Sequence, residues 1–408
     1  MATTRHALCA WRSAANEVRY NGPLTTDNID KAWAAMPAKR TRTKRRRKGK
    51  LREGFTTGTA AAAATKSALQ LLLTGMPLNP ISVTLPEGRV LSVPLRRSLL
   101  DGNTSLCSVV KDGGDDPDVT HGAEIGARVR ILGPTKAKTE IVYKAGEGVG
   151  EVTKPGLPVK VGEPAINPVP RQMIQWAVEE VLDACEAGRD KRVEVEVFVT
   201  DGETLAKKTL NPRLGVLGGL SILGTSGIVR PLSHQAYKET IEAALSVARA
   251  AGRELVLSTG GKSERFARRL LTTLPEECFV QIADFFGFGV EAAVKLGFTK
   301  VTHSVFIGKL VKMAMGLHYT HASSANMDLG ILRKMAREAG EPEELIKRLV
   351  GANTARHALE IMQETRSTAS IIPKLSERAM EVSRNHSQGK LDIHLFLFDY
   401  NGQIIFKA

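Results

Sequence analysis

The sequence predicts a mixed α/β protein in which an N-terminal α+β domain precedes a Rossmann-like domain built on a parallel sheet. Three observations lead to this prediction. Residues 51–190 hold one Ala-rich helical segment among several short β-branched runs. From residue 191 onward, strand-like and helix-like segments alternate four times, which is typical of parallel βα units. The chain of 408 residues is 42% hydrophobic and 25% charged, the composition of an ordinary globular protein.

These patterns divide the chain into four segments. We expect a disordered basic arm over residues 1–50, the α+β domain over 51–190 and the Rossmann-like α/β domain over 191–330. Residues 331–408 are expected to form a helical segment and a C-terminal hairpin that packs on the core. A chain of this length is long enough for two or three folded domains, each with its own core.

The basic arm carries most of the net charge. Residues 1–50 hold thirteen Lys or Arg and three Asp or Glu, which is +10 of the +14 carried by the whole chain. Nine of these cations lie in KRTRTKRRRKGK, residues 39–50. Such a run repels itself and cannot bury a core. Nucleic-acid binding is one interpretation, but no aromatic side chains are interleaved in the run. A solubilising extension is therefore favoured, and a nucleic-acid partner is not expected for the remaining chain.

The first domain opens with a predicted helix over residues 60–73, which has high helix propensity. Strand-like runs follow it, separated by turn residues: ISVTLP (81–86), RVLSVPL (89–95), SLCSVVKD (105–112), ARVRILG (127–133) and TEIVYKAG (139–146). A passage rich in Gly and Pro then leads to a second helix, over about residues 170–187.

The second domain begins with the strand-like run RVEVEVFVT (192–200). Helix and strand patterns then alternate: a helix over 233–252 that is capped by Ser233, the strands ELVLS (254–258), CFVQIAD (278–284) and KVTHSVFIG (300–308), and helical segments after each of these strands. Helices are expected up to about residue 385. The last segment, KLDIHLFLFDYNGQIIFKA, predicts a hairpin that turns at residues 400–402.

Several classes of protein are not expected. No run of about 18 apolar residues is present, so no membrane span is predicted, and the N-terminus lacks the apolar core of a signal peptide. The four cysteines, Cys9, Cys107, Cys185 and Cys278, are far apart and form no CxxC pair. They are expected to be reduced thiols of a cytoplasmic protein rather than zinc ligands or disulfides. A homo-oligomer remains open.

Four loops follow predicted strands of the parallel sheet, where ligands bind at the carboxyl ends. The longest, residues 211–229, is rich in glycines that let backbone N–H groups approach a ligand. STGGKSE (258–264) precedes a helix N-terminus and could cradle an anion or a ribose. Asp284 follows the next strand, and Gly308 with Lys309 the last one. No loop matches GxGxxG or a P-loop, so turn glycines are an equally weighted interpretation of the three shorter loops.

A second cluster lies between the third predicted strand and the fourth, in KDGGDDPDVTHGAEI, residues 111–125. Four aspartates and one histidine crowd together there. The pattern does not match an EF-hand, and one histidine is too few for a zinc site, so no metal is predicted. A solvated turn and an acid/base or ligand site both remain open, because crowded carboxylates raise one another's pKa and a histidine side chain is a common general acid or base. The later stretch THASSANMD (320–328), with His318 beside it, favours structural histidines when read alone.

Several ordered stretches together resemble one family, the cobalt-precorrin-5B C1-methyltransferases of the anaerobic cobalamin pathway, known as CbiD. The stretches are LREGFTTGTAAAAATKSAL, KDGGDDPDVTHGAEI, GEPAINPVPRQMI, NPRLGVLGGLSILGTSGIV, STGGKSE and FIGKLVKMAMGLHYTHA, and they span residues 51 to about 330. The resemblance implies transfer of a methyl group from S-adenosylmethionine to ring carbon 1 of a cobalt-containing tetrapyrrole, cobalt-precorrin-5B. The product would be cobalt-precorrin-6A, and the cobalt belongs to the substrate. Ala60 stands where the family often has Cys, so a thiol is not required there.

The resemblance also gives the polar clusters expected roles. Catalytic residues are expected in the acidic stretch: Asp115, Asp116, Asp118 and His121. The cofactor S-adenosylmethionine is expected at Gly215, Gly218, Gly219, Gly224, Thr225, Gly260, Gly261 and Asp284. The tetrapyrrole substrate is expected to bind at Thr56, Thr57, Gly58, Glu163, Asn167, Arg213, Lys309 and His321. Of these, Thr56, Thr57, Arg213 and Lys309 are expected to hold its carboxylates. Because methyl transfer needs an in-line approach of sulfonium and carbon, positioning should dominate catalysis.

Two alternatives remain. A different Rossmann-type enzyme acting on a nucleotide would bind NAD(P) tightly and would not respond to S-adenosylmethionine. A nucleic-acid-binding protein would act through residues 39–50 and would lose its affinity when residues 1–50 are deleted.

Overall fold

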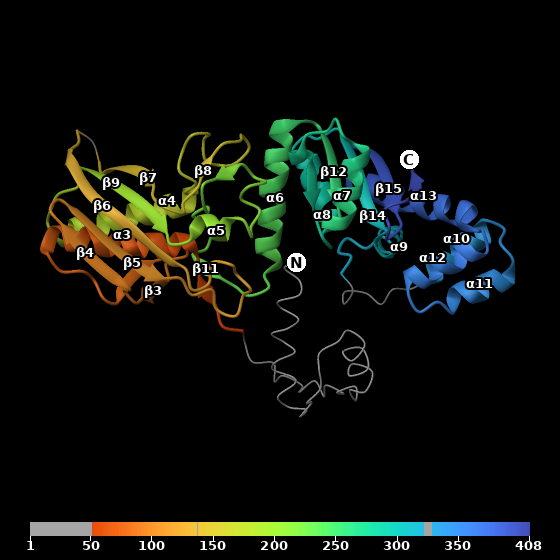
Figure 1. The fold of residues 1–408 in the computed structure, drawn as a ribbon, viewed down its shortest axis with the longest axis horizontal. Helices are drawn as coiled ribbons and strands as arrows, with labels where there is room; N and C mark the ends of the chain where they lie inside the picture. The colour runs from red at the N-terminus through yellow and green to blue at the C-terminus, as the bar shows by residue number, and fades with distance from the viewer. Residues whose placement is uncertain (1–50, 137, 322–328) are drawn as a thin grey trace, which may run out of the picture. The chain divides into compact units, whose positions relative to one another are not determined.

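The structure, a computed structural model, describes residues 51–136, 138–321 and 329–408 (Figure 1). The predicted basic arm lies outside the described residues, so its disorder and its purpose stay predictions. Mixed α/β architecture is confirmed, since the described residues form two five-stranded sheets, three two-stranded sheets and helices packed against them. No described helix has both the length and the apolar character needed to cross a membrane.

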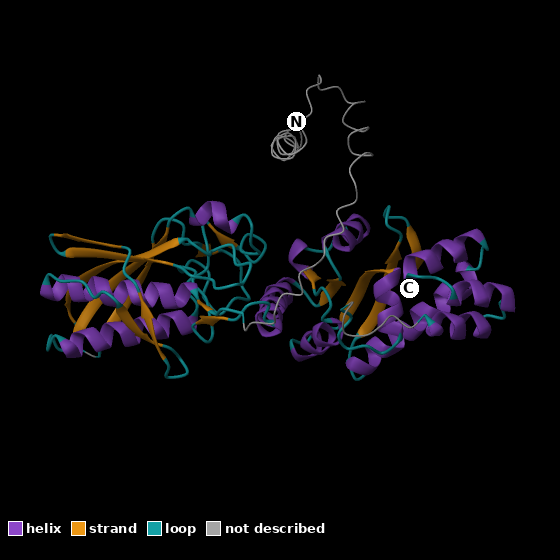
Figure 2. Cartoon of the chain, turned by 90° about the horizontal axis from the view of Figure 1, so that it is seen from below, coloured by secondary structure: helices purple, strands orange, loops and turns teal. Residues whose placement is uncertain are grey.

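The first large sheet has the order β4-β5-β6-β9-β7. Its strands are β4 (Arg97–Asp101), β5 (Thr104–Val110), β6 (Glu124–Pro134), β7 (Glu140–Ala145) and β9 (Lys191–Val199). All neighbours are antiparallel except β7 and β9, which run parallel. Two helices, α3 (Thr57–Thr74) and α4 (Pro168–Ala184), lie against one face of this sheet, as Figure 2 shows.

Alternating side chains explain why this sheet has one covered face. In β9 the side chains of Val193, Val195, Val197 and Val199 are fully buried under the helices. Between them, Glu194 and Glu196 form ion pairs with Arg130 and Arg128 of β6. Helix α3 can pack closely because residues 60–64 are all fully buried alanines. A two-layer α/β arrangement follows, with the charged pairs on the uncovered face.

One assignment made from the sequence was wrong. Strand β9 was expected to begin the Rossmann-like domain, but it pairs with β6 and β7 in the first sheet. The physical reason is its period-2 alternation of valine and charge, which suits a sheet with one solvated face. A strand inside a parallel sheet covered on both faces has a continuous apolar run instead, as in β12 (Glu254–Ser258), of which Leu255–Ser258 are buried.

Three small sheets complete the first half. Strands β2 (Ile81–Thr84) and β3 (Val90–Val93) form a hairpin, and β8 (Glu151–Val152) pairs with β10 (Val216–Leu217). The third pair joins distant segments, because β1 (Gly54–Phe55) pairs with β11 (Ile228–Val229). This last pair holds the long glycine-rich loop next to the start of α3. A short helix, α5 (Gly202–Ala206), follows β9.

The second large sheet has the order β13-β12-β14-β15-β16. Beside β12 it contains β13 (Phe279–Gln281), β14 (Lys300–Phe306), β15 (Asp392–Phe398) and β16 (Ile404–Lys407). The first four strands of this order are parallel, and β16 is antiparallel to β15. Strands β15 and β16 form the C-terminal hairpin, and β15 is also a full parallel neighbour of β14. Chain order reverses between β12 and β14, so the carboxyl ends of these two strands form a topological switch point.

Helices cover both faces of this sheet. Helix α7 (Gly261–Leu270) packs on one face through Phe266, which meets Val256, Phe396 and Phe398. The other face carries Leu257, Val305 and Leu395 within the largest core cluster. The helices that complete that cluster are α6 (His234–Ala251), α8 (Phe286–Lys295), α9 (Ile307–Ala314), α10 (Gly330–Glu338), α11 (Glu343–Val350), α12 (Ala355–Glu364) and α13 (Thr368–His386). A short 3₁₀ helix, η1 (Glu276–Cys278), precedes β13.

Candidate active site

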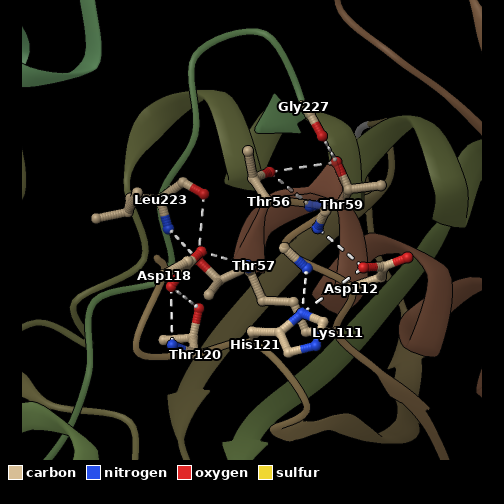
Figure 3. A network of polar contacts seen from close by, with 12 residues as sticks. Thr56, Thr57, Thr59, Lys111, Asp112, Asp118, Thr120, His121, Leu223 and Gly227 are labelled. Carbon is tan, nitrogen blue, oxygen red and sulfur yellow. Dashed lines mark hydrogen bonds and ion pairs between the residues drawn. The ribbon is translucent and has the colours of Figure 1, made fainter. Parts of the chain in front are cut away.

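The acidic loop, residues 111–123 between β5 and β6, is organised by a buried cation. The side chain of Lys111 is 1% exposed, and its Nζ lies 2.5 Å from a carboxylate oxygen of Asp118. The other oxygen of Asp118 accepts hydrogen bonds from the backbone N–H of Thr120 (2.8 Å) and from its hydroxyl (2.6 Å). Figure 3 shows this group beside the N-terminus of α3. The stretch is therefore not a simple solvated turn.

The charge of Lys111 decides the ionisation of Asp118. Burial by itself would raise the pKa of Asp118, but attraction to Lys111 and hydrogen bonds from Lys111 and Thr120 outweigh burial and lower the pKa below its usual value. The carboxylate is thus charged at neutral pH. A charged, fully engaged carboxylate is suited to holding the loop and less suited to giving or taking a proton.

The other three aspartates tie the loop to neighbouring segments. Asp112 forms a two-pronged ion pair with Arg52, which lowers the pKa of Asp112, chiefly through the hydrogen bond. Asp115 accepts a hydrogen bond from the backbone N–H of Arg52 at 2.7 Å. Asp116 accepts one from the backbone N–H of Leu232 at 2.9 Å. The loop therefore bridges the segment before α3 and the segment before α6.

His121 is held in one orientation by the backbone. Its Nδ1 accepts a hydrogen bond from the backbone N–H of Gly113 at 3.0 Å. In the neutral ring this leaves the proton on Nε2. The ring is half exposed, at 53% of the side chain. His121 therefore presents an N–H donor outward, while the lone pair that a general base would need is used by Gly113.

The N-terminus of α3 is filled by the chain itself. The hydroxyl of Thr57 donates to the carbonyl of Leu223 and accepts from its N–H, at 3.2 and 2.9 Å. The backbone N–H of Gly58 also donates to the Leu223 carbonyl, at 3.0 Å. The side chain of Thr56 caps the helix by accepting from the N–H of Thr59. The expectation that Thr56, Thr57 and Gly58 offer free donors to an anion is therefore not met.

A small pocket lies where these parts meet. Its volume is about 170 Å³, and its walls come from the start of α3, the acidic loop and the glycine-rich loop. The residues that line it are Thr56, Thr57, Lys111, Asp118, Val119, Thr120, Thr209, Asn211, Leu220, Ser221, Leu223 and Val229. The structure thus brings together three of the residues predicted from sequence, Thr56, Thr57 and Asp118. We call this cavity the polar pocket.

Most glycines of the loop 211–229 have a packing role. A side chain at Gly219 would meet the carbonyl oxygen of Gly148 at 2.2 Å, and one at Gly224 would meet Thr56 at 2.4 Å. One at Gly215 would meet the side chain of Lys154 at 2.5 Å. These glycines let the loop approach the rest of the first half closely. Only Gly218, with φ of 82° and no atom of a described residue within 4 Å of its Cβ position, has open space.

Thr225, the last residue assigned to the cofactor in this loop, lies on another contact. Its hydroxyl is 3.3 Å from a carboxylate oxygen of Glu239 on α6. A cofactor role for the loop thus gains no support from its packing and stays a prediction.

The switch point of the second sheet carries the remaining predicted cofactor residues. Gly260 and Gly261 directly follow β12 and begin α7. A side chain at Gly260 or at Gly308, after β14, would meet no atom of the described residues within 4 Å. The hydroxyl of Ser258, at the end of β12, is buried and has no hydrogen-bond partner among the described residues. Glycines with free space around them, and a hydroxyl without a hydrogen-bond partner among the described residues, are suited to binding a polar ligand at this point.

Asp284 and Lys309 form a second, partly buried network next to the switch point. They make a direct ion pair, and Lys309 also donates to the carbonyl of Thr320 at 3.2 Å. The backbone N–H of Thr320 donates to the Asp284 carbonyl at 2.8 Å. Burial, aided by the nearby charge of Lys312, lowers the pKa of Lys309 to about 8. A pKa of about 8 leaves Lys309 mostly protonated at neutral pH, so it can pair with the Asp284 carboxylate.

A chain of contacts connects the acidic loop with this second network. Asp116 holds the backbone of Leu232, two residues before the first residue of α6, His234. The Nε2 of His234 lies 3.2 Å from the hydroxyl of Tyr319, and Tyr319 precedes Thr320, which contacts Asp284 and Lys309. The start of α6 therefore links the two groups of polar residues.

The other residues predicted to bind substrate lie apart from the polar pocket's lining. Glu163 pairs with Arg171 at 2.8 Å, and Asn167 precedes α4 without a side-chain cap. Arg213 donates to the carbonyl of Phe279 at 2.8 Å and lines a separate, larger cavity of about 260 Å³ between the loop and α6. The ring of His321 stacks on Tyr319. Residues 322–328 of the polar stretch THASSANMD lie outside the described residues.

Sequence reasoning missed four residues that line or brace the site. Lys111, Asn211 and Ser221 line the polar pocket, and Arg52 braces Asp112. A lysine at the end of an apolar strand-like run, directly before four aspartates, is a signal that could have identified Lys111. Asn211 and Ser221 carry no such signal, because their approach, at 3.2 Å, depends on the path of the loop.

These features define an α/β protein with two large sheets, a polar pocket beside the first of them and an open switch point on the second. Comparison with known families matches the CbiD model to residues 43–231 and the model of the CbiD C-terminal domain to residues 319–408. The chain belongs to the CbiD family.

Curated relatives support this assignment over most of the chain. A protein of Geobacillus kaustophilus (strain HTA426), named cobalt-precorrin-5B C(1)-methyltransferase, is 46% identical over 359 residues, 88% of this chain and 95% of that protein. One of the same name from Leptospira borgpetersenii serovar Hardjo-bovis (strain JB197) is 44% identical over 358 residues, again 88% and 95%. A crystal structure titled cobalamin biosynthesis protein (cbiD) from Archaeoglobus fulgidus is 26% identical and covers 71% of this chain and 85% of its own, with a TM-score of 0.34.

The pair of Lys111 and Asp118 generates a stability prediction. Asp118→Asn should cost about 3–5 kcal/mol in free energy of unfolding, because it leaves a buried ammonium without its counter-charge. Adding Lys111→Met to that variant should recover part of the loss. Since the folded-state pKa of Asp118 is lowered, its contribution is present above its unfolded-state pKa and is lost as pH falls through the folded-state value.

The measurement is urea unfolding of the wild type, both single variants and the double variant between pH 7 and pH 3. The difference in free energy of unfolding between the wild type and Asp118→Asn should become smaller as the pH falls toward 3. A double variant as unstable as the sum of the two single variants would contradict the coupling.

Proposed function

We propose that this protein transfers a methyl group from S-adenosylmethionine to C1 of cobalt-precorrin-5B and so forms cobalt-precorrin-6A. The observation that carries the proposal is the 46% identity to a relative named for this reaction, which extends over 88% of the chain. The match extends over 359 residues, 88% of this chain and 95% of that relative. The polar pocket and the switch point add physical support, one for each substrate of the reaction.

The surroundings of the polar pocket suit one edge of a tetrapyrrole. A cavity of about 170 Å³ is smaller than the roughly 300–1,000 Å³ of sites that enclose a whole ligand. It has room for one small substituent of the ring, while the macrocycle would lie outside. Apolar side chains are exposed there, with Val119 at 37% and Leu223 at 47%, and both line the pocket. Leu232, held by Asp116 in the acidic loop, is 71% exposed. These surfaces suit the apolar face of a flat ring.

The methyl donor is assigned to the switch point of the second sheet, which we propose is the Rossmann-like ligand-binding unit of the chain. S-adenosylmethionine supplies the methyl group as a positively charged sulfonium, an electrophile that needs no metal. Gly260 leaves space for a ligand beside the N-terminus of α7, and the Ser258 hydroxyl has no hydrogen-bond partner among the described residues. Asp284 lies near the same edge, where Lys309 balances its charge, so this pair adds polar groups to the site without a net charge.

Within this mechanism the chain chiefly positions its ligands. The ring carbon is the nucleophile, so the main need is an in-line approach at close range, worth about 7–11 kcal/mol when fully achieved. His121 donates its Nε2 proton outward and can hold a carboxylate or a ring substituent, while its Nδ1 stays bound to Gly113. Asp116 has one oxygen on the N–H of Leu232. It is better placed than His121 to accept a proton, because its second oxygen is not used by that bond.

The reaction itself is the first test. Purified protein, cobalt-precorrin-5B and S-adenosylmethionine labelled in its methyl group are mixed without oxygen, and the tetrapyrrole is analysed by mass spectrometry and NMR. One labelled methyl group on C1 is expected. With intact cofactor and folded protein, no transfer together with tight binding of NAD(P) would favour the alternative of another nucleotide-dependent enzyme.

Asp116 and His121 give the second test in the same assay. Asp116→Asn should lower turnover by about 10²–10⁴-fold if its carboxylate takes the proton. His121→Ala should mainly raise the KM for the tetrapyrrole. Both variants should unfold at the wild-type temperature. Asp101→Asn, which changes an exposed carboxylate at the β4–β5 turn, is the matched control. Wild-type kinetics in both site variants would refute a role for the acidic loop in the reaction.

The donor assignment has its own test, which does not depend on turnover. Gly260→Val places a side chain in open space on an extended backbone, so the protein should fold normally. It should weaken binding of S-adenosylmethionine at least tenfold, as measured by titration calorimetry. Gly351→Val at the end of α11, where a Cβ would make only ordinary contacts, is the control. Equal affinity in both variants would place the donor elsewhere.

A further inference from the structure

Three potential metal ligands from distant parts of the sequence meet at one point in the second half of the chain. Glu291 lies on α8, His318 follows α9, and His386 is the last residue of α13. One donor atom from each lies within 4.8 Å of the other two. This is the only such group of three or more ligands among residues 51–136, 138–321 and 329–408. It is separate from the acidic loop and from the predicted cofactor loops.

Two of the three donor-atom distances in this cluster are near those of a tetrahedral metal centre, and all three donor atoms lie within 4.8 Å of one another. The Nε2 of His318 lies 3.1 Å from Oε1 of Glu291, and the Nδ1 of His386 lies 3.7 Å from the same oxygen. Bonds of about 2.0–2.1 Å at tetrahedral angles place neighbouring ligand atoms roughly 3.3–3.4 Å apart. One measured distance is slightly shorter than that value and the other is slightly longer. Small side-chain rotations would therefore bring the three atoms to bonding distance from a common centre.

The backbone is shaped to hold His318 in this position. The N–H of Gly287, in the first turn of α8, donates to the carbonyl of His318 at 2.9 Å. A side chain at Gly287 would overlap the ring of His318, with its Cβ only 2.1 Å from the nearest ring carbon. Phe286 packs edge-on against His386 with ring centres 5.5 Å apart. Each imidazole thus has a packing neighbour at the start of α8, which limits the positions its ring can take.

The cluster is also open to an external ligand. The side chains of Glu291 and His318 are 43% and 48% exposed, whereas His386 is 20% exposed. Two imidazoles and one carboxylate leave the fourth tetrahedral position to solvent, an arrangement that zinc sites use. Imidazole ligands do not suit Mg²⁺ or Ca²⁺, which prefer oxygen ligands only.

We propose that Glu291, His318 and His386 bind one Zn²⁺ ion, with water as the fourth ligand. This site lies beyond the methyl-transfer function and does not depend on it. The ion would fasten the segment after α9 to α8 and α13. That segment includes Thr320, whose backbone contacts Asp284 and Lys309. The metal would therefore brace the loops that border the switch point.

The test measures metal affinity and stoichiometry in the full-length protein. The protein is treated with a chelator, dialysed and titrated with Zn²⁺ in competition with a chromophoric chelator. We expect one tight site per chain, a rise in unfolding temperature on saturation, and, with Co²⁺ in place of Zn²⁺, the intense visible absorption of a tetrahedral centre.

Three substitutions assign the site. His318→Gln and Glu291→Gln should each weaken Zn²⁺ binding by more than the about 10–100-fold that loss of an outer-shell partner costs. His386→Gln should act in the same way, and circular dichroism confirms that each variant is folded. His394→Gln is the matched control, because His394 pairs with Asp392 at 2.9 Å but belongs to no three-ligand group among the described residues.

Two outcomes would overturn the proposal. The first is absence of tight Zn²⁺ binding to the wild type. The second is tight binding that His318→Gln and Glu291→Gln leave unchanged, which would assign the ion to other residues, such as His6 and Cys9 of the basic arm.

Discussion

The buried ammonium of Lys111 is the constraint on which the polar pocket depends. A lysine that is 1% exposed must have its charge compensated, and Asp118 supplies this at 2.5 Å. To reach Lys111, the acidic loop must turn back on itself, and in doing so it places Thr120 against Asp118 and His121 against Gly113. The turn also carries the backbone of Asp112 to Phe55, just before α3. One buried ion pair therefore fixes the loop, one wall of the pocket and the approach to the helix that forms the next wall.

Glycines in this structure serve two different purposes, which the sequence does not distinguish. In the loop 211–229 most of them permit contact between two parts of the same chain, as Gly219 does with the backbone of Gly148. At the switch point, Gly260 and Gly308 have no described neighbour that would need the space. Both kinds of glycine look alike in sequence, because a glycine indicates only that another group can approach the backbone closely. What comes close depends on tertiary folding. The glycine-rich loop was thus the stronger candidate for a cofactor site from sequence, and it has the weaker physical support.

Secondary structure was predictable where side-chain periodicity reflects burial. Helix α3 and the strands β2, β3, β5, β6 and β7 were all expected from sequence, as were the alternating elements of the second sheet. Strand β4 was missed because all five of its residues are exposed, so burial leaves no pattern in its sequence. Strand β9 was recognised but placed in the wrong sheet, although its alternation of valine and charge indicated a sheet with one solvated face. Pairing depends on which distant strand offers a free edge, and local sequence does not specify that.

The same limit explains which site residues could be found. Asp118 and His121 were found because they cluster in sequence, and a cluster in sequence stays a cluster in space. Glu291, His318 and His386 come from α8, the segment after α9 and the end of α13, so no spacing motif joins them. They converge because α8, α9 and α13 all belong to the largest core cluster, on one face of the second sheet. A bound ion would turn that packing into a fixed link between α13 and the segment that carries Tyr319 and Thr320. Tyr319 contacts His234 at the start of α6, and the N–H of Leu232, just before α6, is held by Asp116. The proposed metal site is thus connected, contact by contact, to the acidic loop.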